Sequence, residues 1–150
     1  MRTERKEMRY DREYVKSILP HRDPMLLVDT VEELEPGRRA MTTFWVDPER
    51  EIFVGHFPED PVFPGVYTLE VMGQAADVLV LSTEKYAGKT PLFLGLNSAR
   101  FFRKILPGET IEVRVEIVSE REEKGIVTCG AEAFVGGEKA AACELALAMR

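Results

Sequence analysis

The chain has little of the chemistry that builds metal or disulfide sites, because its 150 residues include two cysteines and two histidines. Cys129 and Cys143 lack the short spacing of zinc ligands and have no companion cysteines nearby. We therefore expect both to be small buried apolar residues in a reducing compartment, and the predicted location of the protein is cytoplasmic.

Long apolar runs and an excess of basic residues are also absent. No stretch of about 18 or more apolar residues occurs, so no membrane span is expected. Residues 1–16 contain no apolar segment of the kind that a secretory signal needs. The net charge of −6 argues against general binding to nucleic acid. The length fits one domain over residues 1–150, with a charged and frayed segment at 1–10.

The stretch from residue 53 to residue 86 organises the rest of the prediction. It opens with an apolar run at Phe53 that we expect to be extended, and prolines follow at positions 58, 61 and 64. A long helix is predicted to start at Gly65, because Pro and Gly leave backbone N–H groups unpaired there. Residues 66–81 are apolar almost all the way round, which predicts a helix enclosed by the fold. Gly88 is predicted to close it.

Three polar side chains interrupt this apolar helix: Glu70, Gln74 and Asp77. Their i, i+4, i+7 spacing places them on one stripe. The stripe is either the solvated edge of the helix or, because its flanks are apolar, a buried row. A buried carboxylate must find a partner or carry a raised pKa, and a carboxylic acid that stays protonated near neutral pH is suited to general acid catalysis.

The two histidines have different settings. His56 lies between Phe53 and Phe57, just ahead of the loop that leads to the predicted helix start. A lone histidine is more often structural than catalytic. However, a base near an acid and near free N–H donors suits the removal of a proton next to a carbonyl group. For His21 no acid partner is evident in the nearby sequence, so we expect a structural hydrogen bond.

Short elements are predicted around the long helix. Asp11 is placed to cap a short helix that ends before Pro20. A strand is predicted from Met25 to Leu34, and it turns at 35–38 into a second strand at 39–46. Residues 138–149 favour a helix by propensity, but their alternating apolar residues predict a strand. This strand ends a meander over 92–101, 111–117, 126–135 and 138–149, with glycine turns at 125 and 136–137.

A small basic cluster stands out in this acidic chain: Arg100, Arg103 and Lys104, interleaved with apolar residues. Such a cluster is usually solvated surface. It would also suit a partner with carboxylate or phosphate groups, since arginine makes planar, charge-assisted contacts with both.

Five blocks of the sequence carry a resemblance to a known family. They are LPHRDPMLLVD (19–29), GHFP (55–58), PVFPGV (61–66), LEVMGQAA (69–76) and ARFFRKILPGE (99–109). In this order they resemble the 3-hydroxyacyl-[acyl-carrier-protein] dehydratases of bacterial fatty-acid synthesis, FabZ type, and the resemblance covers residues 13–149. It implies an α+β hot-dog fold, in which a curved antiparallel sheet wraps a long central helix. It also implies a homodimer, assembled as a trimer of dimers.

The resemblance further implies a hydro-lyase that converts a (3R)-3-hydroxyacyl thioester of acyl carrier protein into the trans-2-enoyl thioester and water. His56 would remove the C2 proton and Glu70 would protonate the departing 3-hydroxyl group, with the two residues supplied by different subunits. The Gly65 N–H would bind the thioester oxygen, and Gln74 would orient the carboxyl group. No cofactor or metal is expected, because this elimination involves no overall change of oxidation state. The basic cluster would dock the carrier protein with its phosphopantetheine.

Two alternatives stay open. A hot-dog acyl thioesterase would use Glu70 with water on the acyl carbonyl, but it leaves His56 without a clear task. A non-catalytic acyl-thioester binder or lipid-responsive regulator normally needs an added DNA-binding segment, and residues 1–10 are too few to form a helix-turn-helix.

Overall fold

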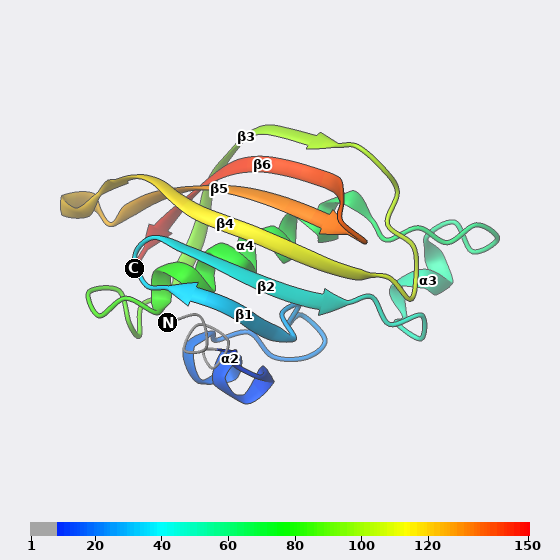
Figure 1. Cartoon of the computed structure of the whole chain (residues 1–150), viewed down its shortest axis with the longest axis horizontal. Helices are drawn as coiled ribbons and strands as arrows, with labels where there is room; N and C mark the ends of the chain where they lie inside the picture. Colours follow the sequence, from blue (N-terminus) through cyan, green and yellow to red (C-terminus); the bar gives the residue numbers. More distant parts are fainter. Residues whose placement is uncertain (1–8) are drawn as a thin grey trace.

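One long helix, wrapped by a single sheet, forms the centre of the computed structural model, which describes residues 9–150 (Figure 1). The helix is α4 (Gly65–Leu81), and the six antiparallel strands follow the order β1-β2-β4-β5-β6-β3. The strands are β1 (Thr30–Glu35), β2 (Arg39–Trp45), β3 (Pro91–Phe101), β4 (Thr110–Arg121), β5 (Ile126–Val135) and β6 (Glu138–Met149). This arrangement confirms the predicted α+β hot-dog fold.

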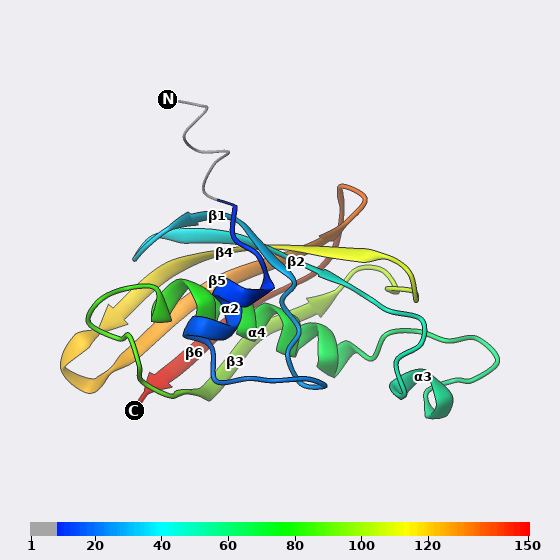
Figure 2. The ribbon, with the colours of Figure 1, turned by 90° about the horizontal axis from the view of Figure 1, so that it is seen from below.

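The helices other than α4 lie at the margins of the sheet. Figure 2 shows the sheet curving over one side of α4, with α2 (Arg12–Ile18) close to β1 and α4. The single turn α3 (Ile52–Gly55) lies beyond one end of the sheet, and the 3-10 turn η1 (Glu122–Lys124) joins β4 to β5. Among residues 9–150, no helix is both long enough and apolar enough to cross a membrane.

The core lies between α4 and the concave face of the sheet. Every residue of α4 from Val71 to Leu81 is buried, as expected for a helix that is apolar nearly all the way round. In β5 every second residue is buried, which is the period-2 pattern of a strand with one face on the core. Cys129 and Cys143 lie in this core as free, buried thiols, as predicted.

Two predicted features of the meander are confirmed in detail. Gly136 and Gly137 join β5 to β6 with φ values of 58° and 82°, the two positive values that a type I′ hairpin turn requires. Residues 138–149 form β6 despite their helix propensity, because this strand is hydrogen-bonded to β5 on one side and to β3 on the other.

Three predicted boundaries were wrong. The strand expected to start at Met25 starts only at Thr30, because the backbone of residues 25–27 bonds to a side chain of α4 instead of a neighbouring strand. The run from Phe53, expected to be extended, contains the helical turn α3, in which Phe53 alone is buried. Helix α4 ends at Leu81 and not near Gly88, since the hydroxyls of the next two residues bond back to carbonyls 79 and 80.

The prediction of a frayed segment at 1–10 concerns mostly residues outside the described part of the chain. For the two described residues it was wrong. Tyr10 exchanges two backbone hydrogen bonds with Val31 of β1, and the Arg9 guanidinium donates to Glu32 at 2.8 Å. The described chain therefore starts as a short extension of the sheet edge.

Candidate active site

The first turn of α4 presents unpaired backbone donors. Pro64 is the N-cap and supplies no side-chain bond, and the N–H groups of Gly65 and Val66 find no acceptor among the described residues. Such groups give a helix start about half a unit of positive charge. A Cβ atom at position 65 would lie 3.1 Å from the Phe101 ring of β3, so glycine allows the strand to approach here. This helix start is suited to bind an oxygen atom that gains negative charge.

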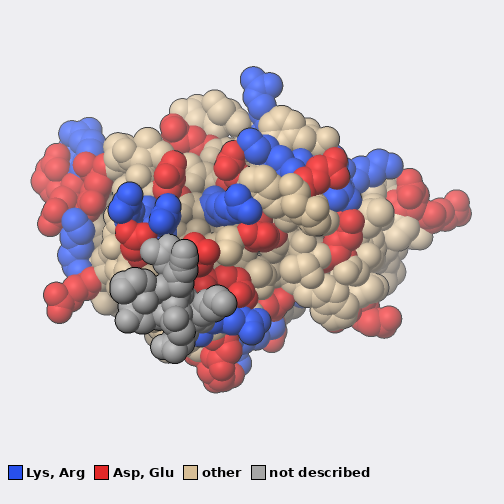
Figure 3. Space-filling view, viewed as in Figure 1, with Lys and Arg blue, Asp and Glu red and all other residues tan. Residues whose placement is uncertain are grey.

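An open pocket of about 350 Å³ lies beside this helix start. Its walls come from the loop before α4, the first turn of α4 and the segment at the end of β3: Val62, Phe63, Gly65, Thr68 and residues 101–105. A larger hollow of about 770 Å³ lies on the outer face of the sheet, but no predicted site residue lines it. Figure 3 shows acidic and basic side chains intermingled over that outer face. We therefore assign the chemistry to the helix and not to the larger hollow.

His56 is fixed in one tautomer by a backbone contact. It follows α3 directly, and its Nδ1 atom lies 2.7 Å from the carbonyl oxygen of Val62. A carbonyl only accepts, so Nδ1 carries the hydrogen and the neutral ring has a free lone pair on Nε2. The ring also packs against Phe57, whose φ of 52° is unusual for a residue other than glycine. The local fold thus orients His56 with Nε2 available as a base.

Glu70 and Gln74 are brought together as predicted. The Gln74 Nε2 atom donates to Glu70 Oε2 at 2.7 Å and to the carbonyl of Met25 at 2.8 Å, while Gln74 Oε1 accepts from the Leu27 N–H at 2.7 Å. All polar groups of this fully buried amide are therefore used within one small network. The network ties the segment before β1 to the second turn of α4 and fixes the Glu70 carboxyl group.

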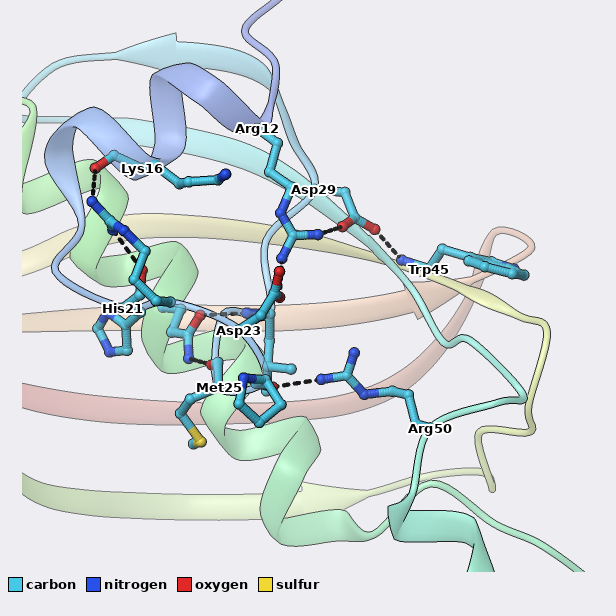
Figure 4. A network of polar contacts seen from close by, with 12 residues as sticks. Arg12, Lys16, His21, Asp23, Met25, Asp29, Trp45 and Arg50 are labelled. Atoms are coloured by element: carbon cyan, nitrogen blue, oxygen red, sulfur yellow. Dashed lines mark hydrogen bonds and ion pairs between the residues drawn. The ribbon is translucent and has the colours of Figure 1, made fainter.

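The segment 19–29 covers the polar stripe of α4, and neighbouring elements hold it in place (Figure 4). Arg12 of α2 pairs with Asp29 at 3.4 Å, and the Arg50 guanidinium donates to the carbonyl of Pro24 at 2.7 Å. The stripe is therefore a buried row. Its interpretation as a solvated edge was wrong for Gln74, which is fully buried, and for Asp77, which is 6% exposed.

His21 lies against two acidic groups that its sequence neighbours did not reveal. Its Nε2 atom is 3.8 Å from Glu70 Oε2 and 3.9 Å from Asp77 Oδ2. Its Nδ1 atom is buried without a hydrogen-bond partner among the described residues, as is Asp77 Oδ1. The expected structural hydrogen bond of His21 is absent from the described chain, so that prediction was wrong. The position of Asp77 on the polar stripe was the signal that could have identified its partner.

His56 and Glu70 do not meet within one copy of the chain. No ion pair within 4.0 Å joins these two described residues. Glu70 and Gln74 lie in successive turns of α4, whereas His56 belongs to the loop that precedes the helix. Among residues 9–150, no three His, Cys, Asp or Glu side chains converge in a way that could hold a metal ion.

The three members of the basic cluster differ in their contacts. One terminal nitrogen of the Arg103 guanidinium donates to both Glu109 carboxylate oxygens, at 2.8 and 3.0 Å, and so braces the turn before β4. Lys104 is exposed and lies 3.9 Å from Asp60, and Arg100 on β3 pairs with no acidic group among the described residues. Arg100 and Lys104 therefore have charge available for a partner, while much of the charge of Arg103 is already compensated.

The edge strand β3 exposes an unusual amount of apolar surface. Its side chains at 92, 93, 94, 96 and 101 are between 45% and 56% exposed, and its outer edge is unpaired. A long apolar edge strand is a ready template for pairing with another strand. This edge lies next to the helix, since Phe93 and Phe101 contact α4 at Gly73 and Gly65.

The fold and site together define a hot-dog protein with acid–base groups at its central helix. A family model described as the FabA-like domain matches residues 19–144. The chain is 46% identical to the 3-hydroxyacyl-[acyl-carrier-protein] dehydratase FabZ of Symbiobacterium thermophilum over 88% of its length and 92% of that protein. It is 44% identical to the same enzyme of Clostridium novyi, over 90% of this chain and 94% of that one. The chain belongs to the FabA-like family, and these relatives are its FabZ-type members.

Solved structures support the fold independently. A chain of the dehydratase heterocomplex ApeI:P from Xenorhabdus doucetiae aligns with a TM-score of 0.76, covering 91% of this chain and 90% of that chain. The sequence identity is 18%, so this likeness bears on the fold alone.

Proposed function

We propose that this protein dehydrates (3R)-3-hydroxyacyl thioesters of acyl carrier protein to trans-2-enoyl thioesters in fatty-acid biosynthesis, and that it does so in the cytoplasm. The observation that carries the proposal is the Glu70 carboxyl group, which Gln74 holds on a buried stripe of α4 close to the unpaired N–H groups at the helix start. The match to FabZ dehydratases along nearly the whole chain supports the same reaction.

Each step of the elimination has a group suited to it. His56 Nε2 takes the C2 proton, and the electron pair of the broken C–H bond forms the C2=C3 double bond as the C3–O bond breaks. Glu70 gives its proton to the departing hydroxyl group, which leaves as water. The Gly65 N–H stabilises the thioester oxygen while it carries enolate charge. After the reaction His56 releases the proton that it took to solvent, and Glu70 takes a proton from solvent. Both groups thereby return to their starting protonation states.

The proposal includes a homodimer in which His56 of one subunit serves Glu70 of the other. It is supported by the lack of an ion pair between the two residues in one described copy and by the apolar edge of β3, which suits pairing with the same edge of a second copy. Assembly of three such dimers is the larger state that we propose from the family resemblance.

One assay tests the reaction. The protein is incubated with a 3-hydroxybutyryl or crotonyl thioester, and enoyl absorbance and free thiol are followed together. Change in the enoyl signal without thiol release supports the dehydratase. Thiol release would instead identify a thioesterase, and no change in either signal would leave a binding protein.

Two variants test the residue roles and the composite site. His56→Ala and Glu70→Gln should each lower kcat by about 10²–10⁴-fold without loss of the fold. When equal amounts of the two inactive variants exchange subunits, about half of the dimers are mixed and each contains one intact site, so about a quarter of wild-type activity should return. No recovery despite demonstrated exchange would place both residues of a site in one chain.

A further inference from the structure

The catalytic stripe of α4 includes a second acid that the proposed reaction does not use. Asp77 lies two turns beyond Glu70, and its side chain is buried beneath the segment that carries His21. The imidazole Nε2 atom of His21 faces both acids, at 3.8 Å from Glu70 Oε2 and at 3.9 Å from Asp77 Oδ2. These distances exceed a hydrogen bond by about 1 Å, which a small ring rotation or one bridging water can span.

Apart from His21, few groups could offset the negative charge of these two acids. Gln74 donates to Glu70 but not to Asp77, and Asp77 Oδ1 has no hydrogen-bond partner among the described residues. From β5, the Cys129 thiol also faces Asp77, but burial raises the pKa of this thiol to about 12, so it brings no charge near neutral pH. In the proposed dimer, His56 of the partner subunit is the remaining titratable group that approaches Glu70.

Two carboxyl groups in one buried site resist the loss of both protons. Burial raises the pKa of Asp77 well above its ordinary value, and the negative charge of Glu70 raises it further. Burial also lowers the pKa of His21, although Glu70 opposes this effect. Because like charges close together cannot both ionise easily, such a pair keeps one proton to a higher pH than a single carboxyl group does.

We propose that His21 and Asp77 are positioning residues for the catalytic acid, and that Glu70, His21 and Asp77 form one proton-sharing cluster that keeps a proton available to Glu70 across neutral pH. After Glu70 has given its proton to the leaving hydroxyl group, the His21 Nε2 lone pair takes the proton of Asp77 as that O–H bond breaks, and the new N–H bond then breaks to give the proton to Glu70. Asp77 regains a proton from solvent, which balances the proton that His56 releases to solvent. This inference rests on the proposed function through the role of Glu70 as the proton donor, and it adds a reason why a second carboxyl group is buried two turns away.

The kinetic test is the pH dependence of kcat/KM in Asp77→Asn. Asp77→Asn removes the second acid of the cluster, and with it the proton that the two acids are proposed to share. The alkaline limb of the kcat/KM profile should therefore move to lower pH. We expect kcat/KM to fall at least about tenfold at pH 8 and to change only a few-fold near pH 5. As a control, Glu116→Gln removes an exposed carboxylate of β4 and should leave the profile in place.

His21→Gln tests the middle of the cluster. It retains both carboxyl groups, so the alkaline limb should stay where it is in the wild type. Loss of the transfer between the acids should lower kcat at every pH while KM stays the same. An Asp77→Asn profile that superimposes on the wild type, or an unchanged kcat in His21→Gln, would overturn the proposal.

A titration without substrate separates this inference from the proposed reaction, and its decisive part uses the wild-type protein. Carboxyl-carbon NMR of the wild-type protein should show Glu70 and Asp77 titrating together in two steps. In Asp77→Asn the Glu70 signal should follow one step. Independent single steps for the two wild-type groups would refute the cluster, whereas inactivity on every thioester would refute only the reaction.

Discussion

Gln74 connects the covering segment to the catalytic helix, and its removal offers a direct test of that connection. We consider Gln74→Leu, which is similar in volume but cannot form hydrogen bonds. The native amide is fully buried and makes bonds of 2.7 to 2.8 Å to Glu70, to the Met25 carbonyl and to the Leu27 N–H. The variant leaves the buried Leu27 N–H and the half-buried Met25 carbonyl without a partner.

The cost follows from these two orphaned groups. Each buried, unsatisfied polar group costs about 1–3 kcal/mol, so the pair costs about 2–6 kcal/mol. Burial of the leucine side chain returns about 1–2 kcal/mol. The midpoints of these two ranges differ by about 2.5 kcal/mol, so we expect Gln74→Leu to lower the free energy of unfolding by about that amount. We also expect kcat to fall, because Glu70 loses the donor that orients it.

Urea unfolding at neutral pH measures the first effect, and steady-state kinetics on a carrier-bound thioester measures the second. Ser82→Ala is the matched control, since it removes a single hydroxyl bond to the Leu79 carbonyl at the end of the same helix. It should cost less than about 1 kcal/mol and leave kcat unchanged. A loss below about 1 kcal/mol in Gln74→Leu would show that other contacts hold the segment, and the reasoning would fail.

Four further variants test other parts of the molecule. A Cβ atom at position 73 would lie 2.4 Å from the Phe93 ring, so Gly73→Ala should displace this ring from α4. In sedimentation experiments the proposed dimer should then dissociate at least about tenfold more readily. An unchanged dimer would contradict the role of the β3 edge. Arg100→Glu should raise KM for the carrier-bound substrate several-fold and flatten its salt dependence, with little effect on a small thioester. Arg103→Glu should impair both substrates because it breaks the brace to Glu109, and equal effects of the two variants would refute this distinction. Burial raises the pKa of Asp77, so the folded protein keeps this proton to a higher pH than the unfolded chain does. The stability that the protonated Asp77 contributes is present below about pH 4 and is lost as the pH rises. The gain in Tm from Asp77→Asn should therefore grow between about pH 5 and pH 8. A gain that does not vary with pH would contradict this.

Local pattern alone determined many of the helices, strands and turns. The apolar run after Gly65 predicted the enclosed helix and its start, and Gly136-Gly137 with alternating apolar residues predicted the last hairpin correctly. These features are local, because helix starts, hairpin turns and strand alternation depend on neighbouring residues. The quoted sequence blocks likewise pointed to the FabA-like family, which the comparisons confirm.

The tertiary structure decided the surroundings of the polar stripe. The sequence could place Glu70, Gln74 and Asp77 on one line of the helix, but both a solvated and a buried interpretation of that line stayed open. Only the folded chain shows that a segment about 50 residues earlier covers this line and brings His21 to the two acids.

The contact between this segment and α4 also explains why β1 begins later than the strand predicted from Met25. Met25 and Leu27 have the apolar character of a strand, yet their backbone groups bond to Gln74 across a sequence separation of 49 and 47 residues. A sequence pattern records which side chains favour burial, whereas the partner that satisfies each buried polar group depends on how distant segments pack. For that physical reason, the helix and the positions of its carboxyl groups were predictable from the sequence, while the contacts of His21 with both acids were not.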